Sequence, residues 1–365
     1  MSNMIIGLGC AGNNIIKLAS TSTFLDDVTM YAIDSVSSTI DLDSVSRIKY
    51  KPIISDERQG SGRIRERGQA MYEFHESNGE FDDMYKDAEE AVSPIILISS
   101  AAGGTGSGSI VPACKALIER DIHVIPIIIC PNKNDPAAFH MNANDLFVEL
   151  GEIGVSTYAI FENRYGDANY GPINQEIVEF IEIILGRHYE KNDVDSIDDS
   201  DLDVILGKAG RIIAVKAEAK SIPLLSKELV RKCFTGPQPA WDSATMNTPT
   251  VVTAFALKSM FAKDDFENAF IEIKNRFNPK SIYDEYRHIV NDDNNGMCSG
   301  SIIISGLPAT ELTVVDNVFD EAQTIGSGIK KSTRPNFMKK KKATIVDDKA
   351  SDGSNAIRKR FTWGK

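Results

Sequence analysis

A run of small residues between two apolar segments constrains this chain most. Residues 99–109 read Ser-Ser-Ala-Ala-Gly-Gly-Thr-Gly-Ser-Gly-Ser, after the apolar run Pro94–Ile98 and before the helix-like stretch Ile110–Arg120. This order predicts a buried strand, a loop without bulky side chains and the N-terminus of a helix. Glycine lets backbone N–H groups approach an anion, and the helix adds unpaired N–H groups and the positive end of its dipole. The run therefore predicts a phosphate-binding loop.

The run has two other interpretations. A flexible Gly/Ser turn is one alternative, but flexible linkers rarely lie between a buried strand and a helix. A Walker A loop is excluded, because no lysine follows Gly108 as the GxxxxGK[ST] pattern requires.

The run resembles the signature loop of the tubulin/FtsZ superfamily, usually written GGGTGSG or GGGTGTG. Ala102 stands in the place of the first glycine of that pattern. The resemblance covers roughly residues 3–325 and implies that GTP or GDP binds, with Mg²⁺ accompanying the phosphates. It implies that the signature loop contacts the nucleotide through Ala102, Gly103, Gly104, Thr105, Gly106, Ser107 and Gly108.

A second glycine turn follows the apolar strand expected at Asn3–Leu8. Gly7, Gly9 and Gly12 also match the GxGxxG dinucleotide fingerprint, and Asp34 ends the next strand, where a carboxylate would meet a ribose. An NAD-dependent oxidoreductase is therefore a rival interpretation. The second glycine loop argues against it, because a dinucleotide fold does not need another phosphate cradle.

The resemblance implies further nucleotide contacts at five places along the first half of the chain. The segment at Gly60–Gly62 could also be a plain turn, and Asn163 or Asn174 could equally be a helix cap. An asparagine amide suits a purine edge because it both donates and accepts hydrogen bonds. The expected residues are Gly9, Cys10, Ala11, Gly12 and Asn13 in the first loop, Asp34 in the second, Gly60, Ser61 and Gly62 beside the terminal phosphate, Pro131 near the ribose, and Asn163 and Asn174 at the guanine.

Apolar strands and amphipathic helices alternate along the chain, which predicts a Rossmann-like α/β fold with a parallel sheet and helices on both faces. Ligands of such folds lie beyond the carboxyl ends of the strands. We expect a nucleotide-binding domain at 1–172, a long central helix at 173–193, a smaller α/β activation domain at 194–325 and a flexible basic tail at 326–365.

An acidic stretch, Ser196–Asp203, follows the central helix and resembles the NxDxxD loop of FtsZ-like proteins. Asp198 and Asp201 match the two acidic positions, while Ser196 replaces the usual asparagine. A carboxylate can orient an attacking water or hold a cation that does so. The alternatives are a solvated helix cap, or a shift of the role to Asp199 or Asp203. The resemblance implies that this loop meets the nucleotide of the next subunit, so that hydrolysis accompanies head-to-tail assembly.

Charge and cysteine content limit the class of protein. The net charge of −12 makes the chain poorly suited to hold DNA nonspecifically. The five cysteines are scattered without a CxxC pair, which argues against a zinc site or a disulfide framework and favours a reducing cytoplasm, here that of a bacterial host cell. We expect neither a signal peptide nor a membrane span.

The tail differs in charge from the rest of the chain. Residues 330–365 hold twelve lysines and arginines against three aspartates, a charge of +9. A flexible basic arm is often an interaction tail, although it could also serve solubility or be a purification scar. Its expected partners are DNA, an adaptor protein on centromere-like DNA, or neighbouring subunits. The tail resembles the plasmid and phage TubZ group, which moves DNA; an FtsZ-like division protein and a non-hydrolysing relative stay as alternatives.

Overall fold

The described part of this computed structural model comprises residues 2–36, 47–54, 60–132, 134–162, 170–187, 197–238, 252–258, 271, 285–290, 297–307, 344–348 and 358–362. Within it, no helix is long and apolar enough to cross a membrane.

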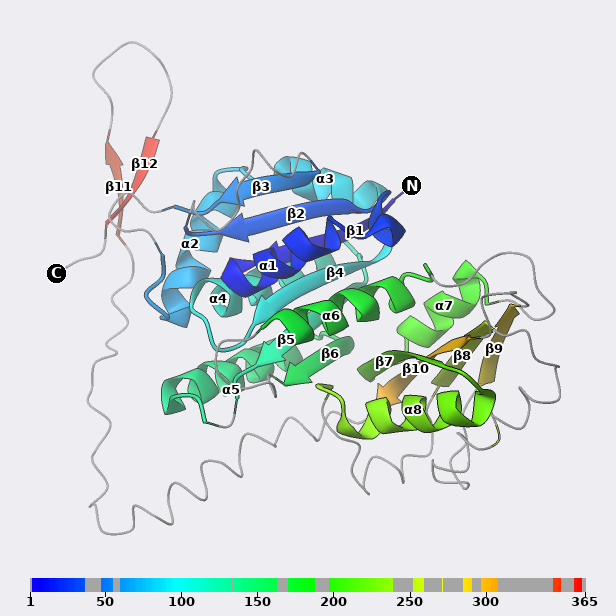
Figure 1. The fold of residues 1–365 in the computed structure, drawn as a ribbon. Helices are drawn as coiled ribbons and strands as arrows, with labels where there is room; N and C mark the ends of the chain where they lie inside the picture. Colours follow the sequence, from blue (N-terminus) through cyan, green and yellow to red (C-terminus); the bar gives the residue numbers. More distant parts are fainter. Residues whose placement is uncertain are drawn as a thin grey trace, which may run out of the picture.

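A ten-stranded sheet forms the centre of the molecule, in the order β3-β2-β1-β4-β5-β6-β7-β10-β8-β9 (Figure 1). Neighbours from β3 to β7 are parallel, whereas β10 pairs antiparallel with both β7 and β8. The strands are β1 (Asn3–Leu8), β2 (Thr29–Asp34), β3 (Ile48–Pro52), β4 (Val92–Ser100), β5 (Val124–Cys130), β6 (Thr157–Glu162), β7 (Gly210–Ala219), β8 (Val252–Lys258), β9 (Glu285–Val290) and β10 (Cys298–Leu307).

The central strands are continuous apolar runs, as buried parallel strands should be. In β1 and β2, every residue after the first is buried, and in β5 every residue before the last is buried. Because these strands are parallel, their carboxyl ends lie along one edge of the sheet, which we call the carboxyl edge; the opposite edge is the amino edge.

Helices cover both faces of the parallel sheet. Apolar side chains of α1 and α6 pack on one face, and those of α2, α3, α4 and α5 pack on the other. Figure 1 shows α6 running beside α1 across the first of these faces. The helices are α1 (Gly9–Ala19), α2 (Arg65–Ser77), α3 (Asp82–Glu90), α4 (Thr105–Ile118), α5 (Ala137–Glu152), α6 (Gly171–Ile184), α7 (Asp199–Leu206) and α8 (Ile222–Thr235), with a short 3-10 turn, η1, at Thr23–Leu25.

The C-terminal strands carry a smaller core of their own. Ile222, Leu225 and Leu229 of α8 pack against buried residues of β7 and β10. This arrangement confirms a second, smaller α/β unit after the central helix. The expected domain boundaries themselves stay predictions.

Several elements differ from the sequence-based expectation. The sequence predicted glycine-rich loops up to Gly12 and Ser109, but α1 already begins at Gly9 and α4 at Thr105. The edge strand β3 and the strand β9 were not predicted. The sequence also predicts helices at 263–277 and 312–324, but of these two segments only Ile271 belongs to the described residues.

The tail also contains regular structure that its composition did not predict. β11 (Thr344–Asp348) and β12 (Arg358–Thr362) pair antiparallel as a separate two-stranded sheet. The run Thr344-Ile345-Val346 is β-branched, which favours a strand. The rest of 326–365 lies outside the described residues.

Candidate nucleotide site

The two glycine-rich segments meet at the carboxyl edge of the sheet. Gly9 follows β1 and Thr105 follows β4, and β1 and β4 are hydrogen-bonded neighbours. A Cβ on Gly9, whose φ is +69°, would lie 2.7 Å from the backbone nitrogen of Gly106. The N-termini of α1 and α4 therefore lie side by side, and only glycine allows this approach.

The Thr105 hydroxyl joins three segments that are far apart in the sequence. Its oxygen lies 2.7 Å from the Ser35 hydroxyl oxygen after β2, and it donates to the Ser61 hydroxyl, 3.1 Å away. The amide of Gly60 also donates to the Ser35 carbonyl, at 3.1 Å. The loops after β2 and β4 and the segment at Gly60–Gly62 are thus one hydrogen-bonded unit. The structure brings together three segments that were expected to contact one nucleotide, and that contact stays a prediction.

Glycine is required in this unit for packing as well as for ligand access. A Cβ on Gly104 would collide with the Ser61 hydroxyl and lie 2.6 Å from the Ile64 nitrogen. A Cβ on Gly108 would collide with the Arg65 carbonyl, so α4 and α2 cross in close contact there. Gly108 also donates its amide to the Gly104 carbonyl, at 3.1 Å. Its amide is therefore already used within the helix, and its contribution to the site is close packing.

Other features of this edge suit an anionic ligand. The N-termini of α1 and α4 receive no side-chain cap, so their first amides can donate to a bound group. A Cβ on Gly103 would meet nothing within 4 Å, which means that open space lies against this backbone. Within the described residues, the buried Asn13 donates its amide to the Ile33 carbonyl; its side-chain oxygen has no hydrogen-bond partner and, as an acceptor, can take a ligand hydroxyl or N–H but not a phosphate oxygen. The residues present fit a phosphate-bearing ligand.

Asp34 is buried at the end of β2, and one carboxylate oxygen accepts the amide of Ser35 at 2.7 Å. Cys10 lies in the first turn of α1. Cys10 is exposed as a residue, but partial burial of its sulfur, together with the charge of Asp34, raises the pKa of the thiol. A thiol with a raised pKa is a poor nucleophile at neutral pH.

A buried arginine fixes the start of α2 against α4 and α5, and the sequence did not single it out. Arg65, the first residue of α2, makes a bidentate ion pair with Glu149 of α5 at 2.6 and 2.7 Å. Its Nε also donates to the Ser107 carbonyl at 3.1 Å. Asn142 of α5 donates to the carbonyls of Ala102 and Arg63, at 3.1 and 3.3 Å. Arg65 and Glu149 are 84 residues apart, and no local pattern announces such a pair.

The remaining predicted nucleotide contacts are placed in part. Pro131 directly follows β5, at the same edge as the glycine segments. Asn174 is the fourth residue of α6, whose N-cap is Tyr170, so the interpretation of Asn174 as an N-cap is wrong. It is partly buried in the first turn of α6. Asn163 lies outside the described residues.

The acidic stretch forms the beginning of a helix. Asp198 is the N-cap of α7 and accepts the Asp201 amide at 2.9 Å, while the Asp201 carboxylate accepts the Asp198 amide at 3.1 Å. This reciprocal pair is a capping box. The helix cap, one of the alternatives for this stretch, is therefore present, and the expected loop ends at Asp198.

The position of α7 separates it from the glycine segments. Gly210, shortly after α7, donates to the Ser156 carbonyl just before β6, so α7 lies at the amino edge. The Asp203 carboxylate lies close enough to His123, just before β5, to oppose the lowering of the His123 pKa by burial. Figure 1 shows α7 and the start of α1 at opposite ends of the molecule. β4 has nine residues and spans about 30 Å, so Asp198 and Asp201 do not reach the glycine segments of their own chain.

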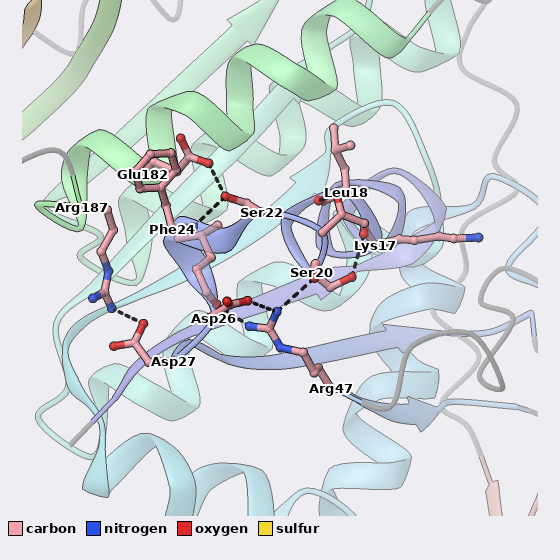
Figure 2. Close-up of polar contacts among 12 residues, drawn as sticks. Lys17, Leu18, Ser20, Ser22, Phe24, Asp26, Asp27, Arg47, Glu182 and Arg187 are labelled. Atoms are coloured by element: carbon pink, nitrogen blue, oxygen red, sulfur yellow. Dashed lines mark hydrogen bonds and ion pairs between the residues drawn. The ribbon is translucent and has the colours of Figure 1, made fainter. Parts of the chain in front are cut away.

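The amino edge is held by polar contacts that join α1, β2 and the end of α6 (Figure 2). The Ser22 hydroxyl donates to Glu182 of α6 at 2.6 Å, and Arg187 pairs with Asp27 at 3.0 Å. Arg187 also donates to Asn3 at the start of β1, at 2.8 Å. These contacts fix the end of α6 at the amino edge, whereas the glycine segments lie at the carboxyl edge.

Among the described residues, no group of three His, Cys, Asp or Glu side chains could hold a metal ion.

Comparison with known proteins identifies the fold. No protein-family model and no curated protein matches the sequence. Among solved structures, the chain is similar to CetZ2 from Haloferax volcanii in a GTPγS-bound protofilament (TM-score 0.68, 18% identity, 88% of this chain and 100% of that chain). It is similar to Bacillus thuringiensis serovar israelensis TubZ in a GTPγS-form protofilament (TM-score 0.67, 15%, 90% and 94%). It is also similar to an empty FtsZ dimer from M. jannaschii (TM-score 0.63, 15%, 84% and 88%). The chain has the tubulin/FtsZ fold, which confirms the fold predicted from the signature loop.

Proposed function

We propose that this protein binds and hydrolyses GTP as the subunit of a head-to-tail filament. One observation carries the proposal: the hydrogen-bonded unit around Thr105, which we propose holds the phosphates and call the phosphate-binding unit, and the acidic turn at Asp198 and Asp201 lie at opposite edges of the same sheet. The two parts therefore cannot form one active site within a single subunit. Stacking the amino edge of one copy on the carboxyl edge of the next brings them together, and such a heterologous contact propagates as a polymer.

The comparisons support the proposal. The similar CetZ2 and TubZ structures are protofilaments with GTPγS, and another TubZ structure is a two-stranded filament. These assemblies share the fold over about nine-tenths of this chain, so the same stacking is open to it.

The residues of this chain have separable roles in the proposed reaction. GTP supplies the phosphoanhydride bond that is cleaved. The amides at the starts of α1 and α4 hold its phosphates, and Thr105 fixes the surrounding loops to one another. Asp198 and Asp201 of the neighbouring subunit orient the attacking water, which is the main task in phosphoryl transfer to water. Mg²⁺ would be held chiefly by the phosphates, as is common for this ion.

We further propose that the filament positions plasmid or phage DNA, as the TubZ resemblance implies. The basic tail at 330–365 supports this, because its charge of +9 suits DNA or an acidic adaptor. Deletion of 330–365 should leave GTP hydrolysis intact and abolish partner binding.

A mixing experiment tests the shared site. The Asp201→Asn protein keeps its phosphate-binding unit and lacks the acid; the Thr105→Ala protein keeps the acid and binds GTP weakly. At a GTP concentration that fills only the first, the mixture should hydrolyse GTP faster than the sum of the two proteins alone. A rate equal to the sum, with both proteins folded and cosedimenting, would contradict a site shared between subunits. Binding of NAD in place of GTP would favour the oxidoreductase alternative.

A further inference from the structure

Arg63 adopts a backbone conformation that its side chain does not favour. Its φ is +63°, and Gly62 before it also has a φ of +63°. A non-glycine residue in this region is strained and is kept there by its surroundings. The Arg63 carbonyl accepts the Asn142 side chain at 3.3 Å, and the guanidinium carbon lies 5.0 Å from the ring centroid of Phe139. These contacts with α5 therefore keep Arg63 in a strained backbone conformation, with its side chain over the helix.

The held guanidinium faces solvent at the carboxyl edge. Arg63 is exposed, and it forms no ion pair with any residue in the described ranges. Arg67, one turn into α2, lies beside Gly62, with its Nη1 3.5 Å from where a Cβ on Gly62 would be. Ile64 is 39% exposed. This edge thus presents a fixed cation next to an exposed apolar side chain.

The amino edge presents the opposite charge in the same combination. Asp203 is exposed on α7, and its neighbour Val204 is 45% exposed. Unlike Asp198 and Asp201, Asp203 takes no part in the capping box. The nearby His123 lines a hollow of about 240 Å³ whose apolar walls include Ile118, Ile122 and Val155. An acid and a partly apolar recess therefore lie together at this edge.

We propose that Arg63 of one copy pairs with Asp203 of the next, with Ile64 packing against the apolar surface around Val204 and the hollow. The inference rests on the proposed head-to-tail assembly and assigns a charge pair to its interface. Charge complementarity favours the correct partner and register. The held geometry of Arg63 reduces the entropy that a free arginine would lose on binding.

Charge reversal and charge exchange test the pair. Arg63→Glu and Asp203→Arg should each raise the critical concentration for GTP-dependent sedimentation about tenfold, which corresponds to about 1.4 kcal/mol per contact. The double variant Arg63→Glu/Asp203→Arg should return to within about threefold of wild type, because the pair is restored with its signs exchanged. Lys115→Glu, on the exposed side of α4, is the matched control and should sediment as wild type.

Each outcome is separable from failure of the proposed function. Thermal unfolding of the Asp203→Arg protein and its GTP affinity before assembly should match wild type, because α7 lies at the edge opposite the glycine segments. If wild type assembles but either single variant assembles equally well, or the double variant is no better than the singles, the pairing is wrong. If wild type itself neither binds GTP nor sediments, the proposed function fails, and the pairing fails with it.

Discussion

The hydroxyl oxygens of Ser35 and Thr105 lie 2.7 Å apart, although 70 residues separate them in the sequence. Both are buried, and Thr105 also donates to Ser61. One threonine therefore sets the spacing between the segments after β2 and β4 and the turn before α2. A ligand bound at the carboxyl edge would lie next to these three segments.

Thr105→Ala removes both hydroxyl contacts and should weaken GTP binding about 5- to 30-fold, since each hydrogen bond contributes about 1 kcal/mol. Thr105→Ser keeps the hydroxyl and should bind within about threefold of wild type. Titration with a fluorescent GTP analogue measures both. Equal affinity of the alanine variant and wild type would remove Thr105 from the site.

Two adjacent glycines should respond differently to the same substitution. A Cβ on Gly104 would lie 2.7 Å from the carbonyl carbon of Arg63, whereas one on Gly103 would meet nothing within 4 Å. Gly104→Ala should therefore lower the free energy of unfolding by about 1–3 kcal/mol, and Gly103→Ala by much less. Thermal unfolding without nucleotide compares them. Similar melting temperatures would contradict the close packing at Gly104.

The charge and the cap of Asp201 can be separated. Asp201→Asn retains an oxygen for the Asp198 amide, so α7 should stay capped, while Asp201→Ala should lose about 0.5–1 kcal/mol of stability. Both variants should form long-lived filaments that hydrolyse GTP slowly. Phosphate release and electron microscopy provide the readout. Fast hydrolysis by the folded asparagine variant would show that the carboxylate is not needed.

The pair Arg65–Glu149 should matter more than exposed pairs. Arg65→Met leaves Glu149 without its partner and should cost about 2 kcal/mol or more, because the Arg65 side chain is only 7% exposed. The double variant Arg65→Met/Glu149→Met should recover part of that loss. Arg231→Met, in an exposed pair with Glu228, should cost about 1 kcal/mol or less. Chemical denaturation tests this order; equal losses for Arg65 and Arg231 would contradict it.

Cys10 should react slowly with iodoacetamide at pH 7.5. Its raised pKa leaves less thiolate than a free cysteine has at that pH, and the thiolate is the reacting species. Raising the pH toward the pKa should speed the reaction, and bound GTP should slow it. Labelling of the Cys10 peptide at or above the rate of free glutathione would show that the thiol is activated instead.

The strongest sequence signals predicted most of the parallel sheet. β1, β4 and β5 are continuous apolar runs, and both glycine segments follow such strands. The helical character of Gly9–Gly12 was missed because glycine disfavours helices on its own. Tertiary packing decides there: a Cβ on Gly12 would collide with the Ile98 carbonyl, so the helix rests directly on β4.

Other features could not be predicted from local pattern. β3 carries Lys49 and Lys51 at the edge of the sheet and lacks an apolar run. Arg65 and Arg63 depend on Glu149, Phe139 and Asn142, which only the fold brings near. The capping box at Asp198 and Asp201 was visible in the sequence as an alternative to a catalytic loop. The structure contains the cap, and the catalytic role of the two aspartates stays a prediction.

The central claim is that hydrolysis requires two copies in contact. Its most direct test is the GTP hydrolysis rate measured against protein concentration, with light scattering recorded on the same samples. We predict a threshold concentration above which hydrolysis and scattering rise together. Hydrolysis that grows linearly with protein and is accompanied by no scattering would contradict the claim and indicate a nucleotide site complete within one subunit.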